Sequence, residues 1–100
     1  MSANWTVAGA QCAAALGDTA GNRARMLATL HQAADRGARL VVFPECALTG
    51  YCFGSRADVR AVAEALPGPA TGAFADVCAK RNVFACFGLI EAAGDKLFNA

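Results

Sequence analysis

The sequence predicts an α/β fold in which parallel strands alternate with helices, and three observations support this prediction. Residues 40–43 form an apolar run without alternation, which is typical of a strand covered on both faces. Between about residues 21 and 36, apolar side chains recur at helical spacing along one face. A short apolar stretch at 5–12 precedes this helix and tolerates β structure. Strand, helix and strand in this order indicate a βαβ unit.

The first helix has clear signals at both of its ends. Gly17 interrupts the chain after the first strand, and Asp18 or Thr19 can then accept a hydrogen bond from the first helical turn. Gly37 follows the last periodic residues, where a left-handed conformation commonly closes a helix. We therefore expect the helix to begin close to residue 21 and to end at about residue 36.

Glu45 marks the carboxyl end of the second predicted strand. Pro44 has no N–H for the strand ladder, so the strand ends there and Glu45 lies at its edge. Ligands of open α/β sheets bind at this edge. A carboxylate buried at such a place is suited to general-base catalysis. A solvated glutamate at the strand end, or one paired with a nearby arginine, would explain the same spacing.

The rest of the chain continues the alternation. A loop at 46–55 leads to a helix that starts at Ser55 with Asp58 and is stopped by the prolines at 67–69. The segments that follow are expected to be a helix capped by Thr71, a strand at 83–91, a turn at 92–95 and a strand at 96–100.

Composition and charge exclude several classes of protein. The chain is 56% hydrophobic with a formal net charge of +1, which argues against disorder. Basic side chains are scattered, so neither nucleic acid nor an anionic membrane is expected as a partner. No apolar stretch reaches the roughly 18 residues that span a bilayer, and the first residues lack the basic region of a signal peptide. We expect one globular domain in the cytoplasm.

The cysteines do not form a metal-binding pattern. There are 5 of them and 1 histidine, His31, with no C-x-x-C pair. We therefore expect no metal site, and we expect reduced thiols that mostly pack as small buried side chains. A redox or metal module built on these cysteines is the weakest functional hypothesis.

The most informative segment is Phe43-Pro44-Glu45-Cys46-Ala47-Leu48-Thr49-Gly50-Tyr51. Further motifs flank it along nearly the whole chain: Gly17-Asp18 with Asn22, Gly37-Ala38, Pro67-Gly68-Pro69, Gly88 and Leu97-Phe98-Asn99-Ala100. In this order they resemble the amino-terminal part of the nitrilase superfamily, the carbon-nitrogen hydrolases. The resemblance implies the front part of an α-β-β-α sandwich and identifies residues 1–100 as the amino-terminal portion of a single domain.

The resemblance also implies a mechanism. The family uses a Glu-Lys-Cys triad without a metal or an organic cofactor, and Glu45 matches its general base. Tyr51 lies in the loop that lines the family's substrate pocket, although a buried tyrosine with a hydrogen-bond partner would explain this residue equally well. The expected substrate is a small amide or N-carbamoyl (ureido) compound, with nitriles less favoured. The family also forms homodimers or higher homo-oligomers.

Two members of the triad do not match any residue of this chain. The family's lysine and cysteine are expected after Ala100. Lys80 and Lys96 fall in a helix and a turn and read as surface residues. Cys46 adjoins Glu45, but the resemblance does not make this position the nucleophile. The alternative function is a non-catalytic half-domain that acts as a binding or assembly module.

Overall fold

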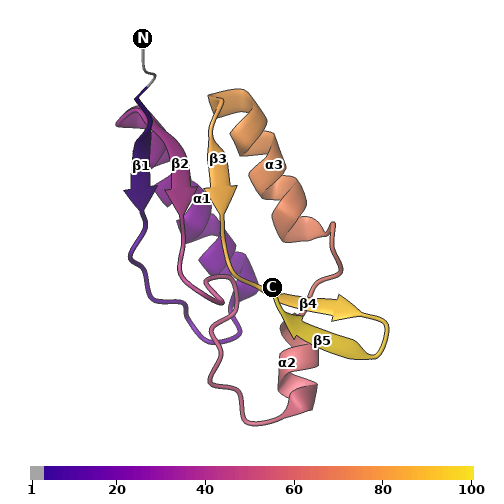
Figure 1. The fold of residues 1–100 in the computed structure, drawn as a ribbon. Coiled ribbons are helices and arrows are strands. Elements are labelled where there is room, and N and C mark those ends of the chain that lie inside the picture. Colours follow the sequence, from indigo (N-terminus) through magenta and orange to yellow (C-terminus); the bar gives the residue numbers. More distant parts are fainter. Residues whose placement is uncertain (1–3) are drawn as a thin grey trace.

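A parallel three-stranded sheet with two helices on one face forms the larger part of the fold, and a β-hairpin follows it (Figure 1). The computed structural model describes residues 4–100. Along the chain the elements are β1 (Thr6–Gly9), α1 (Thr19–Asp35), β2 (Ala38–Val42), α2 (Arg56–Val62), α3 (Pro69–Arg81), β3 (Phe84–Cys86), β4 (Ile90–Ala93) and β5 (Lys96–Asn99). The prediction of an α/β fold with parallel strands is confirmed.

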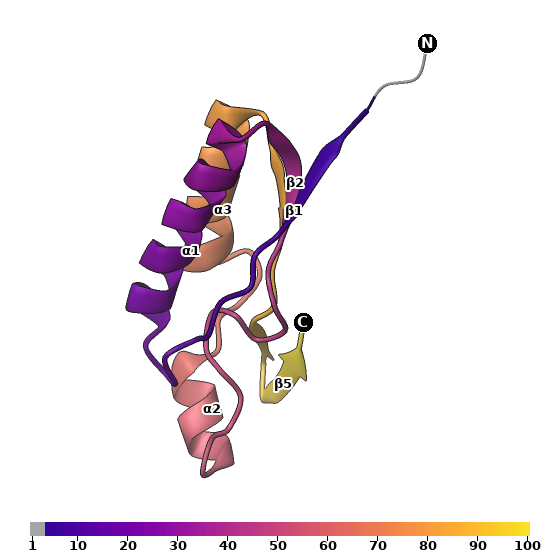
Figure 2. The same ribbon diagram turned by 90° about the vertical axis from the view of Figure 1, so that its left-hand side faces the viewer.

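The core lies between the sheet and the helices α1 and α3, which cover the same face (Figure 2). The sheet has the order β1-β2-β3, so β2 is central, with Val41 paired to Ala8 on one side and to Ala85 on the other. Leu30 of α1 and Phe74 of α3 are buried in this core, where Phe74 contacts the rings of Phe43 and Phe87. Each such side chain stabilises the fold by roughly 1.5–3 kcal/mol through the apolar surface that it removes from water.

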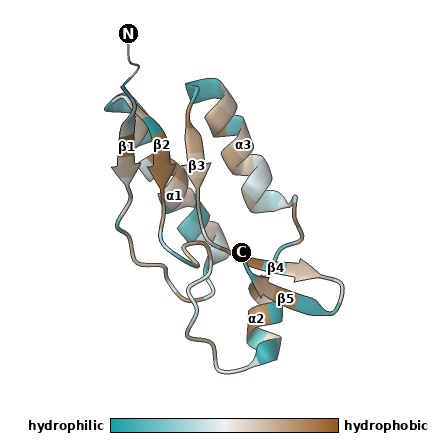
Figure 3. Cartoon of the chain, viewed as in Figure 1, coloured by the Kyte–Doolittle hydropathy of each residue, from teal (hydrophilic) through white to brown (hydrophobic). Residues whose placement is uncertain are grey.

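The opposite face of the sheet is open in the described residues, which corrects the expectation that β2 is covered on both faces. Successive side chains of a strand point to opposite faces, and the helices lie on only one of them. Val7, Val42 and Phe84 are therefore exposed, Phe84 by 57%. Trp5 stacks on Phe84 with 5.6 Å between ring centroids. Most of β2 is coloured as hydrophobic (Figure 3), yet only one of its two faces is covered in the described residues.

The predicted ends of the first helix are close to the observed ones. Asp18 accepts a hydrogen bond from the backbone N–H of Gly21 at 3.1 Å and is the N-terminal cap. The helix therefore begins at Thr19, two residues before the expected start. Gly37 has a φ of +86°, which a residue with a side chain rarely adopts, and the chain turns there into β2.

The second helix is shorter than expected because its last residues join the sheet structure. Ser55 caps α2 and accepts from the N–H of Asp58 at 3.2 Å, as predicted. After Val62 the chain becomes extended, and Glu64 pairs with β4: its N–H donates to the carbonyl of Ile90 at 3.0 Å. This pairing replaces the helical hydrogen bonds that residues 63–66 would otherwise make.

The third helix begins earlier than Thr71. Gly68 is the N-terminal cap and Pro69 is the first helical residue, a position where the missing N–H of proline costs nothing. The Thr71 hydroxyl accepts a hydrogen bond from the N–H of Gly68 at 2.8 Å, so this threonine completes the cap from the third position. Near the other end of α3, Arg81 contacts His31 Nδ1 at 3.0 Å and forms an ion pair with Asp35, which joins α3 to α1.

The predicted strand at 83–91 is two strands with a break between them. β3 ends at Cys86, and β4 begins at Ile90 as the first arm of an antiparallel hairpin with β5. The chain turns between the arms at Gly94, whose φ is +62°. Within residues 4–100, no helix is long and apolar enough to cross a membrane.

Candidate active site

Glu45 lies where the central strand leaves the sheet. The N–H of Phe43 donates to the carbonyl of Cys86 at 2.8 Å, which adds one more hydrogen bond between β2 and β3. Pro44 has no N–H to continue the pairing, and the chain turns away. The predicted place of Glu45, at the carboxyl end of β2, is confirmed. Its side chain is exposed, however, which corrects the expectation of burial, because the described residues cover only the helix face of the sheet.

A tight turn follows Glu45 and packs closely against Gly88. The carbonyl of Cys46 accepts from the N–H groups of Thr49 at 3.1 Å and Gly50 at 2.8 Å. Gly88 has no side chain, and a Cβ there would meet the backbone nitrogen of Cys46 and lie 3.0 Å from the Cα of Glu45. Only glycine permits this approach, so the β3–β4 segment directly supports the backbone that carries Glu45.

Asn22 anchors the same turn from the helix side. It lies on the buried stripe of α1 with Met26 and Leu30, and its side chain is 2% exposed. The amide donates to the carbonyl of Leu48 at 2.9 Å and to that of Ala15 at 2.8 Å, and it accepts from the N–H of Ala15. In the sequence, Asn22 stands out only as part of the motif that begins with Gly17-Asp18. An amide on an apolar helical stripe is itself a signal, because a buried polar group needs partners.

Asn99 brings the hairpin into contact with the Glu45 turn. Its Nδ2 lies 3.3 Å from Oε1 of Glu45, and its Oδ1 lies 3.6 Å from Sγ of Cys46. In the sequence, Asn99 is part of the motif Leu97-Phe98-Asn99-Ala100, which predicts no contact with Glu45. The contact joins residues more than fifty positions apart in the chain, so no local pattern reveals it.

The thiol of Cys46 is protonated at neutral pH. Burial raises its pKa above the ordinary value of 9.0, the negative charge of Glu45 raises it further, and a hydrogen bond with Thr49 lowers it in part. A thiol must lose its proton to act as a nucleophile. The environment of Cys46 is therefore that of a structural cysteine, which agrees with the interpretation of this residue from the sequence.

A hollow of about 310 Å³ opens beside Glu45. Small or apolar residues of the 13–16 segment line one side, and Glu45, Gly50 and Tyr51 line another. Tyr51 is 66% exposed, so it is not the buried tyrosine that was the alternative interpretation. The structure thus brings the two residues predicted for the site, Glu45 and Tyr51, to the same hollow.

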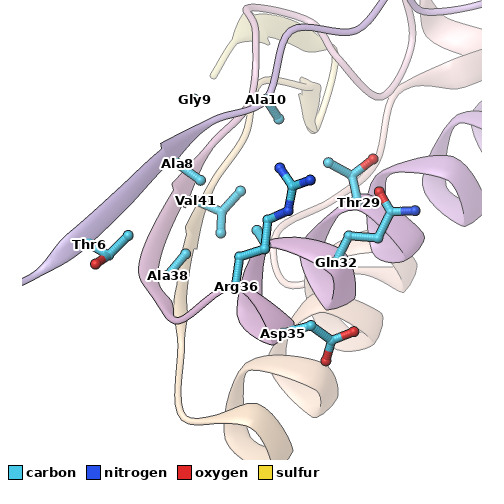
Figure 4. A pocket seen from close by; sticks show the side chains of 11 residues that line it. Thr6, Ala8, Gly9, Ala10, Thr29, Gln32, Asp35, Arg36, Ala38 and Val41 are labelled. Atoms are coloured by element: carbon cyan, nitrogen blue, oxygen red, sulfur yellow. The ribbon is translucent and has the colours of Figure 1, made fainter.

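A larger cavity of about 630 Å³ lies elsewhere, between the edge strand β1 and α1 (Figure 4). On the strand side its lining is mostly alanine and glycine, while Gln32 and Arg36 line the helix side. Its lining includes neither Glu45 nor Tyr51. The small side chains on β1 and β2 account for this space, and the hollow at Glu45 is the better candidate site.

Among the other groups that could take part in catalysis, Cys46 and Cys52 line the hollow at Glu45, whereas Lys80 and Lys96 do not. Lys80 and Lys96 are exposed, on α3 and on the hairpin. The cysteines are free thiols, but Cys12, Cys52 and Cys86 are exposed, which corrects the expectation that most are buried: two lie in loops and Cys86 lies on β3. Within residues 4–100, no three His, Cys, Asp or Glu side chains form a group that could hold a metal ion. The hollow thus holds the carboxylate of Glu45 together with the thiols of Cys46 and Cys52.

Comparisons with known proteins agree with this geometry. The family model described as carbon-nitrogen hydrolase matches residues 6–100. A protein named nitrilase from Pyrococcus abyssi is 38% identical over 72 residues, which are 71% of this chain and 28% of that protein. Crystal structures of an N-terminal amidase, one with a Gln-Val peptide, have a TM-score of 0.76 at 24% identity and cover 91% of this chain and 23% of theirs. The chain thus spans about a quarter of the length of these proteins.

Proposed function

Because this chain belongs to the carbon-nitrogen hydrolase family, we propose that it is the amino-terminal portion of an enzyme that hydrolyses amide or N-carbamoyl substrates, with Glu45 as the general base. The observation that carries the proposal is the position of Glu45. A carboxylate stands at the carboxyl end of the central parallel strand, beside a hollow, on a backbone fixed by Gly88 and Asn22. This is the edge at which α/β sheets bind ligands.

The reaction follows from the triad that the family resemblance implies. Glu45 accepts the proton of a cysteine thiol that we expect after residue 100, and the thiolate attacks the carbonyl carbon. A lysine stabilises the tetrahedral oxyanion, the C–N bond breaks, and ammonia or an amine leaves with the proton that Glu45 took from the thiol. Water then attacks the thioester while Glu45 accepts its proton. The C–S bond breaks and Glu45 passes this proton to the sulfur, which releases the acid and restores the thiol. We favour amides and ureido compounds over nitriles as substrates because the hydrolysis of amides and ureido compounds is more widespread in the family.

Two features support the proposal that residues 1–100 are one portion of a larger domain. The matched part of this chain makes up only 28% of the nitrilase and 23% of the N-terminal amidase. The sheet also presents an apolar face without a cover, and β1 and β3 are both edge strands in the described residues. An uncovered apolar sheet face is a surface that a second layer stabilises.

Ammonia release by the full-length protein, the product of the whole reading frame, tests the function. The panel contains small amides, ureido acids and nitriles. We expect the amides or ureido acids to be hydrolysed and Glu45→Gln to lose activity by about 10²- to 10⁴-fold, the usual contribution of a general base. The folding of this variant is verified by circular dichroism.

Glu91→Gln is the matched control. The hairpin pairs Glu91 with Phe98, and paired residues share a face while neighbours alternate, so Glu91 points away from the face that carries Asn99. This control is expected to retain activity. Turnover by Glu45→Gln at the rate of the parent would remove Glu45 from the mechanism.

A further inference from the structure

The amide of Asn99 lies between the two side chains that begin the turn after β2. Its Nδ2 is 3.3 Å from Oε1 of Glu45, and its Oδ1 is 3.6 Å from Sγ of Cys46. A primary amide carries two donors at one end and an acceptor at the other. Asn99 can therefore serve a carboxylate and a thiol at the same time, provided that each faces the correct end.

The thiol determines which end of the amide faces Glu45. Cys46 is buried beside the negative charge of Glu45, and both factors raise its pKa and keep its proton in place. An S–H group is a donor, so it pairs with the amide oxygen. The amide nitrogen is then directed to the carboxylate, which can only accept. Cys46 thereby acquires a role in orienting the amide that does not require reactivity.

The hairpin holds Asn99 in this place at both of its ends. At the open end, Leu89 and Ala100 exchange two backbone hydrogen bonds of 3.0 Å each, and Leu89 is buried. At the turn, Arg56 and Arg60 of α2 donate to the carbonyl of Asp95 at 2.8 Å and 2.6 Å. Asn99 is thus carried by an element that is fastened to the rest of the fold, not by a loose end.

We propose that Asn99 is a positioning residue for Glu45: its side-chain amide holds the carboxylate through Oε1 and leaves Oε2 to accept the proton. The inference rests on the proposed function of Glu45 as the base. A glutamate side chain has several rotatable bonds, and an exposed one samples many directions. One hydrogen bond from a fixed amide restricts this freedom before substrate binds, which is the geometric requirement for proton transfer.

Two substitutions in the full-length protein test the proposal. Asn99→Asp keeps the shape but places a second carboxylate against Glu45, and like charges disfavour ionisation. We expect kcat to fall about 10- to 100-fold, as for loss of a hydrogen bond to a charged group, with KM little changed. The acidic limb of the pH profile of kcat should also move to higher pH. Asn99→Ala should lower kcat by a similar factor without moving the acidic limb. This variant tests the proposal if Asn99→Asp does not fold.

The control for added charge is Asn4→Asp, because Asn4 is exposed and precedes β1. It should leave kcat and the pH profile unchanged. If both Asn99 variants kept the kcat and the pH dependence of the parent, the proposal would be overturned. The pH profile is the informative readout, because a residue that only supports the hairpin would not move the acidic limb.

A measurement that needs no turnover separates this proposal from the proposed function. The measurement is ¹⁵N NMR of the full-length protein, in which the side-chain amide signal of Asn99 is assigned by its loss in Asn99→Asp. In the parent protein this signal should shift as the pH is lowered. The same signal should not shift in Glu45→Gln. A signal that behaves identically in both proteins overturns the positioning role even if the enzyme is active. If the substrate panel shows no hydrolysis, the proposed function is wrong. The NMR result still shows whether the amide of Asn99 contacts the carboxylate of Glu45.

Discussion

Glu45 is placed by neighbours that carry no charge. Pro44 ends the ladder, Gly88 admits the turn at close range, and Asn22 holds that turn to α1 through the carbonyl of Leu48. None of these residues needs to touch a substrate. Each determines where the carboxylate points, so substitutions at these positions are expected to act on the site through the backbone.

Residue-level prediction from the sequence succeeded where the local chain alone decides the outcome. Pro44 has no N–H whatever its surroundings, so the strand end and the location of Glu45 followed directly. The exposure of Glu45 and its contact with Asn99 depend on the opposite end of the chain and on the layer that covers the sheet. Such contacts have no local sequence signal.

The raised pKa of Cys46 gives a pH dependence of stability. Because the folded state holds this proton more tightly than the unfolded chain, the stabilisation is complete below the unfolded pKa, near 9.0, and is lost as pH rises through the folded pKa. We expect the free energy of unfolding of the full-length protein in urea, with a reductant present, to fall between pH 8 and pH 10. The fall should be smaller in Cys46→Ala.

Cys52→Ala is the control for this measurement, since Cys52 is an exposed free thiol and its removal should leave the pH slope as in the parent. An identical slope in the parent and in Cys46→Ala would show that Cys46 does not carry the effect.

At the scale of elements, the hairpin and α2 act as one unit beside the sheet. Glu64 joins β4 by backbone pairing, and the two arginines of α2 reach the carbonyl of Asp95 at the hairpin turn. Sequence periodicity located α2 and α3 and the local cap of α2 at Ser55, but α2 ends earlier and α3 begins earlier than predicted. The sequence predicts one strand for β3 and β4 because residues 83–90 are apolar apart from Gly88. The break at Gly88 is set by the turn that packs against it.

We expect Arg60→Ala to loosen the hairpin. Arg60 donates to the carbonyls of both Asp95 and Gly94, so its removal leaves the hairpin turn with one arginine. Hydrogen exchange in the full-length protein should then become faster for residues 90–99 and remain unchanged in α1. The exposed Arg36, at the end of α1, supplies the matched Arg36→Ala control. Unchanged exchange at 90–99 would show that the arginines do not hold the turn.

At the scale of the whole molecule, the described fold is one layer of helices on one layer of sheet. The helix face is packed with apolar side chains, whereas the opposite face is apolar and open. A continuous apolar run indicates a strand with two covered faces, and only one of them is covered within residues 4–100. The sequence pattern thus indicates that β2 needs an apolar cover on both faces, and the described residues provide this cover on one face.

The isolated polypeptide 1–100 is expected to associate in solution. Its open sheet face and its two edge strands offer apolar surface and unpaired backbone groups to other copies. Light scattering should show association, and the dye ANS should bind strongly, whereas the full-length protein should bind it weakly and unfold cooperatively. A soluble, monomeric 1–100 with a cooperative thermal transition would contradict the proposal of a partial domain and favour a self-sufficient binding module.

The chain contains 1 tryptophan, and it lies on this open face, where Trp5 stacks on Phe84 and has the guanidinium of Arg39 over its ring at 5.1 Å. Indole emission depends on whether water reaches the ring. The fluorescence of Trp5 is therefore an intrinsic reporter of the second layer: emission at long wavelength marks a bare sheet, and a shift to shorter wavelength marks the moment when that face becomes covered.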